Sequence, residues 1–115
     1  MNTPILDVYF FATNTNNEPV REWFQQLTSG DKKLIGEDLK TVQFGWPLGM
    51  PLVRHVDGEL WETRSKLSAG IARVLFVLDG NKMILIHAFI KKQQKTPKPD
   101  LDLAKARVKQ LRKRL

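Results

Sequence analysis

The sequence predicts an α+β protein in which an N-terminal helical hairpin packs on a mainly antiparallel sheet and a basic helix follows the last strand. Three observations predict this class. Apolar residues recur at helical spacing between residues 20 and 42, the period changes to that of strands between residues 52 and 90, and helical spacing returns after residue 100. The expected order is β-α-α-β-β-β-β-α in one domain over residues 1–115, with no repeat or linker dividing it.

The N-terminal part of the chain predicts one strand and two helices. Ile5 to Phe11 is rich in β-branched and aromatic residues, as strands are, and Thr13 to Asn17 is a turn cluster. We expect Asn17 to cap a first helix that has Pro19 in its first turn. The apolar stripe expected on this helix is Val20, Trp23, Phe24 and Leu27. A second helix is expected from Ser29-Gly30-Asp31 to Gly45 and Pro47, with Leu34, Ile35, Leu39 and Val42 on its apolar face.

The middle of the chain predicts four strands in two hairpins. Asp57-Gly58 is a strong turn signal between the expected strands Leu52–Val56 and Glu59–Leu67. The expected strands Ile71–Leu78 and Met83–Ile90 flank the turn Asp79-Gly80-Asn81. These last two runs are almost wholly apolar, which favours the centre of a sheet that is covered on most of both faces. We expect the two helices to cover one face and to leave the other partly open.

The last segment predicts an amphipathic helix that begins near Pro97 or Pro99, with Asp100 and Asp102 favourably placed near its N-terminus. A narrow apolar seam repeats at alternating three and four residues. We expect this seam to pack on the protein's own core; its members are Leu101, Ala104, Val108, Leu111 and Leu115.

The charge distribution indicates a polyanionic partner. The net charge is +7, and residues 91–115 hold ten Lys and Arg against two Asp, whereas residues 1–90 hold nine basic and ten acidic side chains. A concentrated basic segment attracts nucleic acid through Coulomb steering and counterion release. The alternative is a solvated helix face that only keeps the protein soluble.

Several classes of protein are disfavoured. No apolar run has membrane-spanning length, and no signal-peptide pattern is present, so we expect a cytoplasmic protein without a membrane partner. The chain has no cysteine, which excludes disulfides and thiolate chemistry. There is no Gly-rich phosphate loop or nucleophile elbow, and the acidic residues lack metal-ligand spacing. We therefore expect neither a metal nor another cofactor.

A phosphodiester reaction in such a protein would depend on cations, with the 2′-hydroxyl of RNA as the nucleophile. It needs a group that removes the 2′-hydroxyl proton, cations that stabilise the phosphorane, and an acid for the leaving 5′-oxygen. Glu62, Arg64 and Lys66 alternate and so share one face of a strand. Arg73 interrupts an apolar run, where a cation is costly unless it is paired or functional. A salt bridge to Glu62 is the purely structural alternative for Arg73.

The last strand offers further candidates on one face. His87 has a near-neutral reference pKa and could take part in catalysis or contact substrate, or it could be an ordinary core histidine. Phe89 could stack on a base or pack in the core. Lys91 lies at the end of the same face. Lys92 and Lys95, which follow this strand, are further candidates, and so is His55 in the second predicted strand. A solvated loop is the alternative for the lysines.

Three motifs carry a resemblance to a known family. They are Leu60-Trp61-Glu62-Thr63-Arg64, then Gly70-Ile71-Ala72-Arg73-Val74-Leu75-Phe76, then His87-Ala88-Phe89-Ile90-Lys91-Lys92-Gln93-Gln94-Lys95-Thr96-Pro97. Together they resemble the HigB-like, phage-related branch of the RelE/ParE toxin superfamily, and the order of elements agrees along nearly the whole chain. The resemblance implies a RelE-like fold and a metal-independent endoribonuclease that cuts mRNA in the ribosomal A site. It also implies a cognate antitoxin, usually a helix-turn-helix DNA-binding protein, and contact with operator DNA only through the toxin–antitoxin complex.

The resemblance also implies roles for individual residues. Arg64 and Arg73 correspond to sheet cations that bind phosphate and stabilise the transition state. Lys91 and Lys92 correspond to a basic pair that contacts phosphate or transfers a proton. Glu62 would orient the arginines, and the residues assigned to substrate binding are Lys66, Phe89, Lys95 and His55.

The chain departs from the RelE pattern at one position. The RelE pattern that this chain resembles has a tyrosine near the C-terminus, which acts as a proton-transfer group. The only tyrosine of this chain is Tyr9, in the first predicted strand. Removal of the 2′-hydroxyl proton is therefore left to His87 or to a lysine whose pKa is lowered by neighbouring cations. The superfamily also contains ParE-like toxins that poison DNA gyrase, and a non-catalytic nucleic-acid-binding module is a third alternative.

Overall fold

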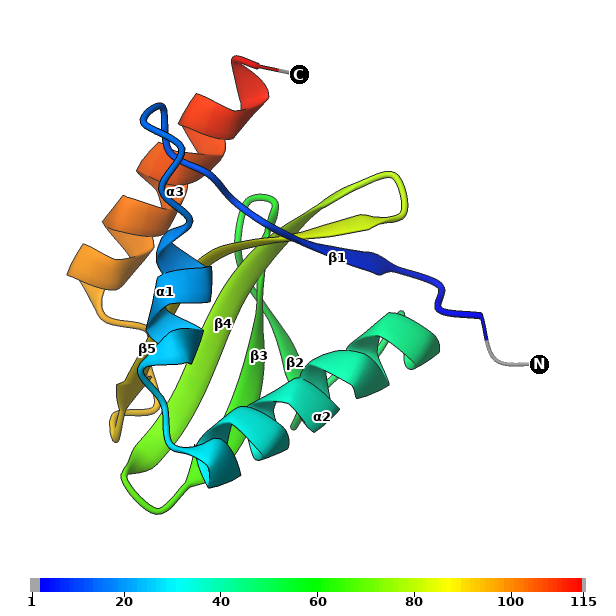
Figure 1. Ribbon diagram of the computed structural model, residues 1–115, viewed down its shortest axis with the longest axis vertical. Helices are drawn as coiled ribbons and strands as arrows, with labels where there is room; N and C mark the ends of the chain where they lie inside the picture. The colour runs from blue at the N-terminus through cyan, green and yellow to red at the C-terminus, as the bar shows by residue number, and fades with distance from the viewer. Residues whose placement is uncertain (1–2, 115) are drawn as a thin grey trace.

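The computed structural model describes residues 3–114 (Figure 1). Its order of elements confirms the expected one. The bounds are β1 Asp7–Phe10, α1 Pro19–Gln25, α2 Ser29–Gly45, β2 Val53–Asp57, β3 Leu60–Leu67, β4 Gly70–Asp79, β5 Lys82–Lys91 and α3 Lys98–Arg112. Among these residues, no helix is long and apolar enough to cross a membrane.

The five strands form one sheet in the order β1-β5-β4-β3-β2. β1 pairs in parallel with β5, and every other neighbouring pair is antiparallel. The sheet is therefore mainly antiparallel, as expected. The two apolar strands β4 and β5 lie inside it, because a strand buried on both faces needs apolar side chains at almost every position.

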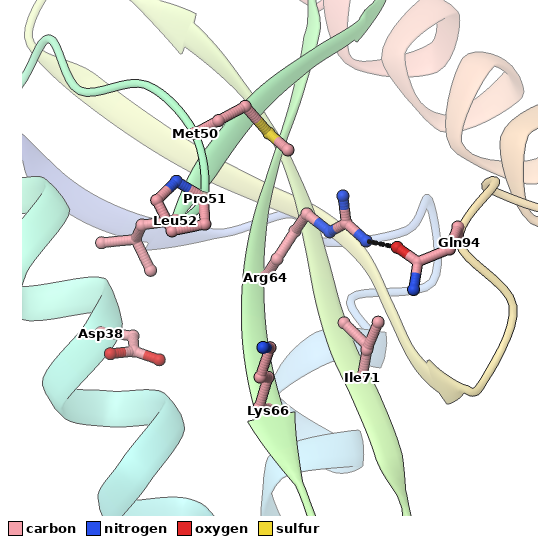
Figure 2. A pocket seen from close by; sticks show the side chains of 8 residues that line it. All are labelled: Asp38, Met50, Pro51, Leu52, Arg64, Lys66, Ile71 and Gln94. Atoms are coloured by element: carbon pink, nitrogen blue, oxygen red, sulfur yellow. Dashed lines mark hydrogen bonds between the residues drawn. The ribbon is translucent and has the colours of Figure 1, made fainter.

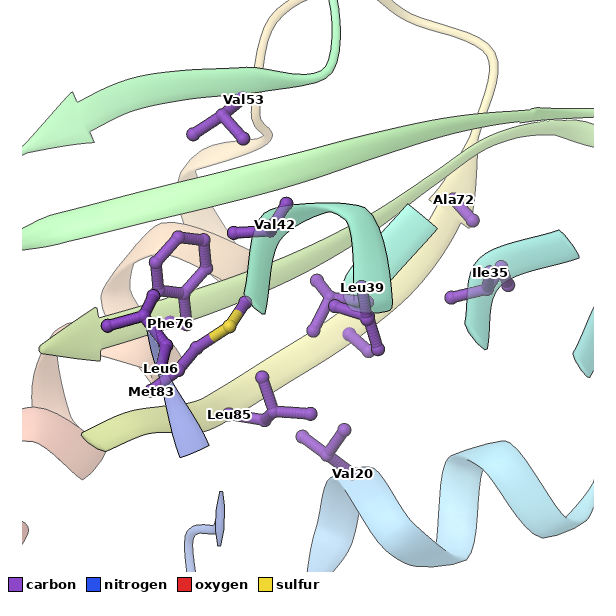
Figure 3. Close-up of a cluster of buried hydrophobic side chains, with 12 residues drawn as sticks. Leu6, Val20, Ile35, Leu39, Val42, Val53, Ala72, Phe76, Met83 and Leu85 are labelled. Carbon is purple, nitrogen blue, oxygen red and sulfur yellow. The ribbon is translucent and has the colours of Figure 1, made fainter. Parts of the chain in front are cut away.

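Helices α1 and α2 pack on one face of the sheet, over the core shown in Figure 3. Val20 of α1 and Ile35 and Val42 of α2 are buried against residues of β4 and β5 such as Phe76 and Leu85. The expectation that Leu34 belongs to the apolar face of α2 is wrong. Its side chain is exposed, because the buried stripe of the helix runs through Ile35, Leu39 and Val42 instead.

Helix α3 packs on the opposite face of the sheet from α2 (Figure 1). Ala104, Val108 and Leu111 are buried in a second core with residues of β4 and β5. This confirms that the seam of α3 packs on the protein's own core; Leu115, the last predicted member, lies outside the described residues. The part of this face that α3 leaves uncovered carries the charged cluster described below.

The helix caps differ in one place from the expected ones. The N-cap of α1 is Glu18 rather than Asn17, because the Asn17 side chain bonds Thr15 and its backbone N–H bonds Thr13. The side chain of Thr28 accepts a hydrogen bond from the backbone N–H of Asp31 and so caps α2.

A β-bulge in β5 decides which side chains face α3. Leu75 of β4 pairs with His87, whereas the next residue, Phe76, pairs with Leu85, so Ile86 is the extra residue. As a result Ile86 lies in the α3 core and His87 also contacts α3. The bulge therefore brings the last part of β5, with His87, Phe89 and Lys91, to the same face as Glu62 and Arg64.

Candidate nucleic-acid and catalytic site

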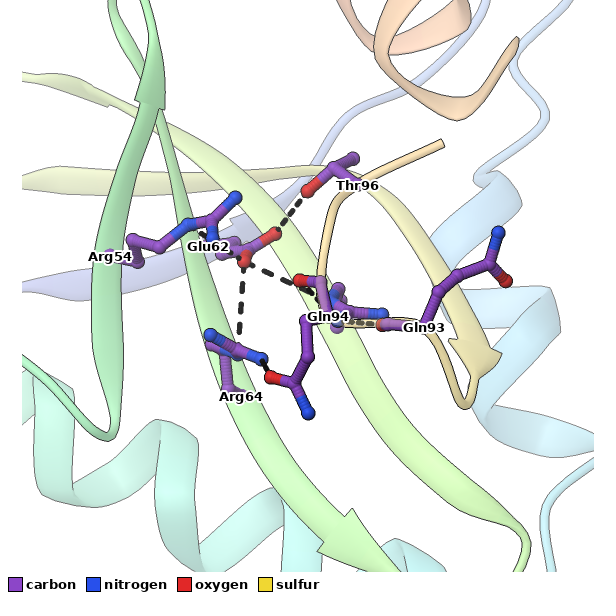
Figure 4. Close-up of polar contacts among 7 residues, drawn as sticks. Arg54, Glu62, Arg64, Gln93, Gln94 and Thr96 are labelled. Atoms are coloured by element: carbon purple, nitrogen blue, oxygen red, sulfur yellow. Dashed lines mark hydrogen bonds and ion pairs between the residues drawn. The ribbon is translucent and has the colours of Figure 1, made fainter. Parts of the chain in front are cut away.

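A buried carboxylate lies at the centre of the charged cluster (Figure 4). Glu62 of β3 is fully buried, and its Oε1 lies 3.4 Å from Nε of Arg54, 3.8 Å from Nε of Arg73 and 3.9 Å from Nε of Arg64. Its Oε2 accepts a hydrogen bond of 2.9 Å from the hydroxyl of Thr96. Three guanidinium groups thus share one carboxylate, and the cluster keeps an excess of positive charge.

Strand pairing assembles this cluster. Arg54 of β2 pairs with Glu62, and Arg64 pairs with Arg73 of β4, so neighbouring strands place these side chains next to one another on one face. Lys66 and Lys91 lie in the adjacent cross-strand row, on either side of Ile71. Residues from four strands therefore contribute cations to the part of the sheet that α3 does not cover.

Arg73 is held inside the protein. Its side chain is fully buried, and its Nη2 donates to the backbone carbonyls of Gln93 and, at 2.8 Å, of Gln94. Burial lowers the pKa of Arg73, and the Coulomb effect of Glu62 opposes that change. Arg73 therefore fixes the segment of residues 92–97, which follows β5, over the sheet.

Arg64 differs from Arg73 in that it reaches solvent. Its side chain is 10% exposed, and its Nη2 donates to Oε1 of Gln94 at 3.0 Å (Figure 4). It also lines a cavity of about 540 Å³ between α2 and the end of β3 (Figure 2). Arg54 also reaches solvent, but Arg64 combines contact with solvent and a place at the cavity, and its guanidinium fork matches two oxygens of a ligand phosphate.

The cavity beside Arg64 has apolar walls and a few polar groups. It lies beside the start of β2, where β3 continues past that strand, and Figure 2 shows Arg64 and Lys66 across it from Asp38. Its lining residues are Asp38, Met50, Pro51, Leu52, Arg64, Lys66, Ile71 and Gln94.

A second polar group joins β5 to the start of α3. Asp100 accepts hydrogen bonds from Nε2 of His87 at 2.7 Å and from Nζ of Lys91 at 2.8 Å. Arg107 lies on the other side of the imidazole, with its Nη1 3.0 Å from the carbonyl oxygen of Ile86 and 3.3 Å from Nδ1 of His87. Because a guanidinium only donates, Nδ1 of His87 accepts and Nε2 carries the proton given to Asp100.

Burial lowers the pKa of His87, and Arg107 and Lys91 act in the same direction, while Asp100 opposes them. The hydrogen bonds from His87 and Lys91 lower the pKa of Asp100, although its own burial acts in the opposite direction. The group is therefore a neutral imidazole bonded to an ionised carboxylate at neutral pH. Lys91 is 40% exposed and remains accessible from solvent.

The other predicted site residues differ in where they lie: Phe89 is in the cluster, two lysines are beside it, and His55 is apart from it. Phe89 is buried against His87, with the cations of Arg73 and Lys91 within 5.8 and 5.6 Å of its ring centroid, so it packs in the cluster. Lys92 and Lys95 are exposed on the 92–97 segment beside the site.

His55 lies apart from the cluster. Its ring contacts Trp61, which packs against the core on the α2 face of the sheet, and its Nε2 lies 2.6 Å from the carbonyl oxygen of Gly58. His55 pairs with Trp61 across the strands and therefore points to the face opposite Arg54 and Glu62. The structure does not bring it together with Arg64.

Sequence reasoning missed several members of the site. Arg54, Asp38 and Arg107 come from elements that carried no motif. Alternation along β2 was a usable signal for Arg54, because it faces away from the buried Val53. Asp100 was noted only as a helix N-terminal residue, yet it bonds two of the predicted site residues. Within residues 3–114, no group of three or more His, Asp or Glu could hold a metal ion.

The fold and the cluster define a class: a small α+β protein, compatible with a RelE-like fold, that carries a cationic site on its sheet. Residues 22–109 match the family described as phage-derived Gp49-like protein (DUF891), so the chain belongs to that family. It is a RelE/ParE-like family of toxin–antitoxin toxins, and this association implies an antitoxin partner. No curated protein matches the chain.

Proposed function

We propose that this protein is a HigB-like toxin that cuts mRNA on the ribosome without a metal ion. The observation that carries the proposal is the solvent-reaching Arg64, held at 3.9 Å from buried Glu62 and flanked by exposed lysines. A phosphorane transition state gains negative charge, and preorganised cations stabilise it without reorganisation at the moment of reaction. The association of the family with toxin–antitoxin toxins supports the proposal.

In this proposal Arg64 binds the scissile phosphate and stabilises the phosphorane. Glu62 fixes its guanidinium, and Arg73 acts from the interior by fixing the 92–97 segment and keeping the local charge positive. Lys66, Lys92 and Lys95 hold the neighbouring phosphates of the RNA through Coulomb attraction.

The contacts favour Lys91 over His87 for proton transfer. Both ring nitrogens of His87 are engaged, one by Asp100 and one by Arg107. Lys91 is more exposed, and Asp100 holds its ammonium group in place. We assign Lys91 the protonation of the leaving 5′-oxygen, and His87 the positioning of Asp100. The proton of the attacking 2′-hydroxyl passes to solvent water, which reaches the side chains of Arg64 and Lys91.

The test is incorporation of labelled methionine and thymidine after induced expression without an antitoxin. We expect protein synthesis to stop first and Arg64→Ala to abolish the arrest. Lys109→Ala, which removes an exposed cation from α3 far along the helix, should leave the arrest unchanged. Early loss of DNA synthesis with translation intact would contradict the proposal and favour a ParE-like gyrase poison.

A further inference from the structure

The cavity beside Arg64 has the shape and the polar groups of a site for a nucleobase. Its volume of about 540 Å³ lies within the range of small-ligand sites, which are mostly apolar with a few placed polar groups. Its walls come from Met50, Pro51, Leu52 and Ile71. Such side chains can pack against the face of a planar ring, and Arg64 at the rim can hold the phosphate attached to it.

Two opposite charges face this cavity without pairing to each other. Ser65 donates to Oδ2 of Asp38 at 2.6 Å and so fixes the carboxylate. Within residues 3–114, no donor bonds Oδ1, and no ion pair joins Asp38 to Lys66. Asp38 of α2 therefore offers hydrogen-bond acceptors to the cavity, and Lys66, across from it on β3, offers an ammonium donor (Figure 2).

Among the four RNA bases, guanine matches this pair of groups best. Its Watson–Crick edge presents two adjacent donors, N1–H and the 2-amino group, which a carboxylate can accept together, and beside them the O6 acceptor. Uracil and cytosine each present one donor group on that edge, and adenine presents its 6-amino group alone. Bases of single-stranded RNA are read on these edges while their faces stack on protein side chains.

We infer that this cavity binds a guanine base of the RNA whose phosphate Arg64 holds, with Asp38 accepting from N1–H and the 2-amino group and Lys66 donating to O6. This inference rests on the proposed function for the source of the base. Asp38 is then a specificity-determining residue supplied by α2, outside every motif that resembles the family.

The first test measures binding of 5′-GMP, AMP, CMP and UMP to the isolated protein by calorimetry or NMR titration. We expect GMP to bind about tenfold more tightly than the others, since a bidentate base contact discriminates at that level. Asp38→Asn keeps an oxygen acceptor for Ser65 but replaces one base acceptor with a donor, so the preference should disappear. Glu37→Gln is the control: it removes one negative charge from the exposed position directly before Asp38 in α2, and the preference for GMP should remain.

Equal affinities for the four nucleotides, no binding at millimolar concentration, or an unchanged preference in Asp38→Asn would each overturn the inference. The second test maps cleavage sites on RNA. Wild type should cut beside guanine, and Asp38→Asn should cut without that preference. If the preference for GMP depends on Asp38 but Asp38→Asn does not change the positions of the cuts, the guanine that this cavity binds does not come from the RNA substrate. If wild type prefers GMP yet cuts no RNA, the proposed function fails while the guanine site remains.

Discussion

Glu62 and Arg73 form an ion pair, with Oε1 3.8 Å from Nε, in which neither side chain is exposed to solvent. Arg73 also keeps Nε and Nη1 without a hydrogen-bond partner among the described residues, so the Glu62 charge is its main compensation. A buried charge that loses its partner destabilises a protein by far more than a surface ion pair contributes. The same ion pair therefore stabilises the folded sheet and holds the residues of the candidate site in place.

We predict that Glu62→Gln lowers the free energy of unfolding by about 3 to 5 kcal/mol, because it leaves the Arg73 cation buried and uncompensated. Urea denaturation of purified protein measures this change. Arg54→Met removes the half-exposed partner of the same carboxylate and should lower the free energy by roughly 1 kcal/mol or less. Equal losses in both variants would show that burial of Arg73 is not the cause.

Arg64 should be separable from folding. Arg64→Ala removes one hydrogen bond, to Gln94, and a partly exposed guanidinium, so we expect a stability change of about 1 kcal/mol. Toxicity should be lost, and Arg64→Lys should restore only part of it because an ammonium lacks the bidentate fork. Growth after induction and thermal unfolding of the same variants check both statements. Full toxicity in folded Arg64→Ala would contradict this assignment.

The pH dependence of stability should report His87. Because burial holds its folded-state pKa below the ordinary histidine value of 6.5, the unfolded chain binds the proton more readily. The stabilisation is then complete above pH 6.5 and is lost as the pH falls through the folded-state pKa. His87→Gln should flatten the unfolding free energy in this window. NMR titration should show the His87 signals changing below pH 6.5 in wild type and in a His55→Gln control; a midpoint above 6.5 would refute the prediction.

Helix α3 provides a matched pair of leucines for testing its packing. Leu111 is buried in the second core and Leu103 is exposed on the same helix. We expect Leu111→Ala to lower the free energy of unfolding by about 2 to 3 kcal/mol. Leu103→Ala should change it by less than about 0.5 kcal/mol. Urea denaturation distinguishes them, and equal effects would mean that α3 does not pack as described.

The fold was largely predictable because the hydrophobic period changes sharply along the chain. The apolar runs that became β4 and β5 indicated central strands, and Gly58 and Gly80 marked turns in which both glycines have positive φ. Strand register was not predictable in the same way. β2 and β3 pair with a shift between His55 and Asp57, and only the folded register places Arg54 opposite Glu62.

The site could be predicted only in part, because several of its contacts join elements that are far apart in the sequence. Alternation correctly grouped Glu62 with Arg64, and the cost of a buried cation correctly suggested that Arg73 pairs with Glu62. The contacts of Asp100 with His87 and Lys91 join α3 to β5, and those of Asp38 join α2 to β3. No local pattern encodes such contacts, since they depend on how helices pack on the two faces of the sheet.

The most direct test of the central claim is cleavage of a defined mRNA in purified ribosome complexes, followed by analysis of the new ends. Attack by the 2′-hydroxyl with Arg64 on the phosphate predicts a 2′,3′-cyclic phosphate and a 5′-hydroxyl, formed by wild type and absent with Arg64→Ala. No cleavage by folded wild type, or ends that carry a 5′-phosphate, would contradict the account.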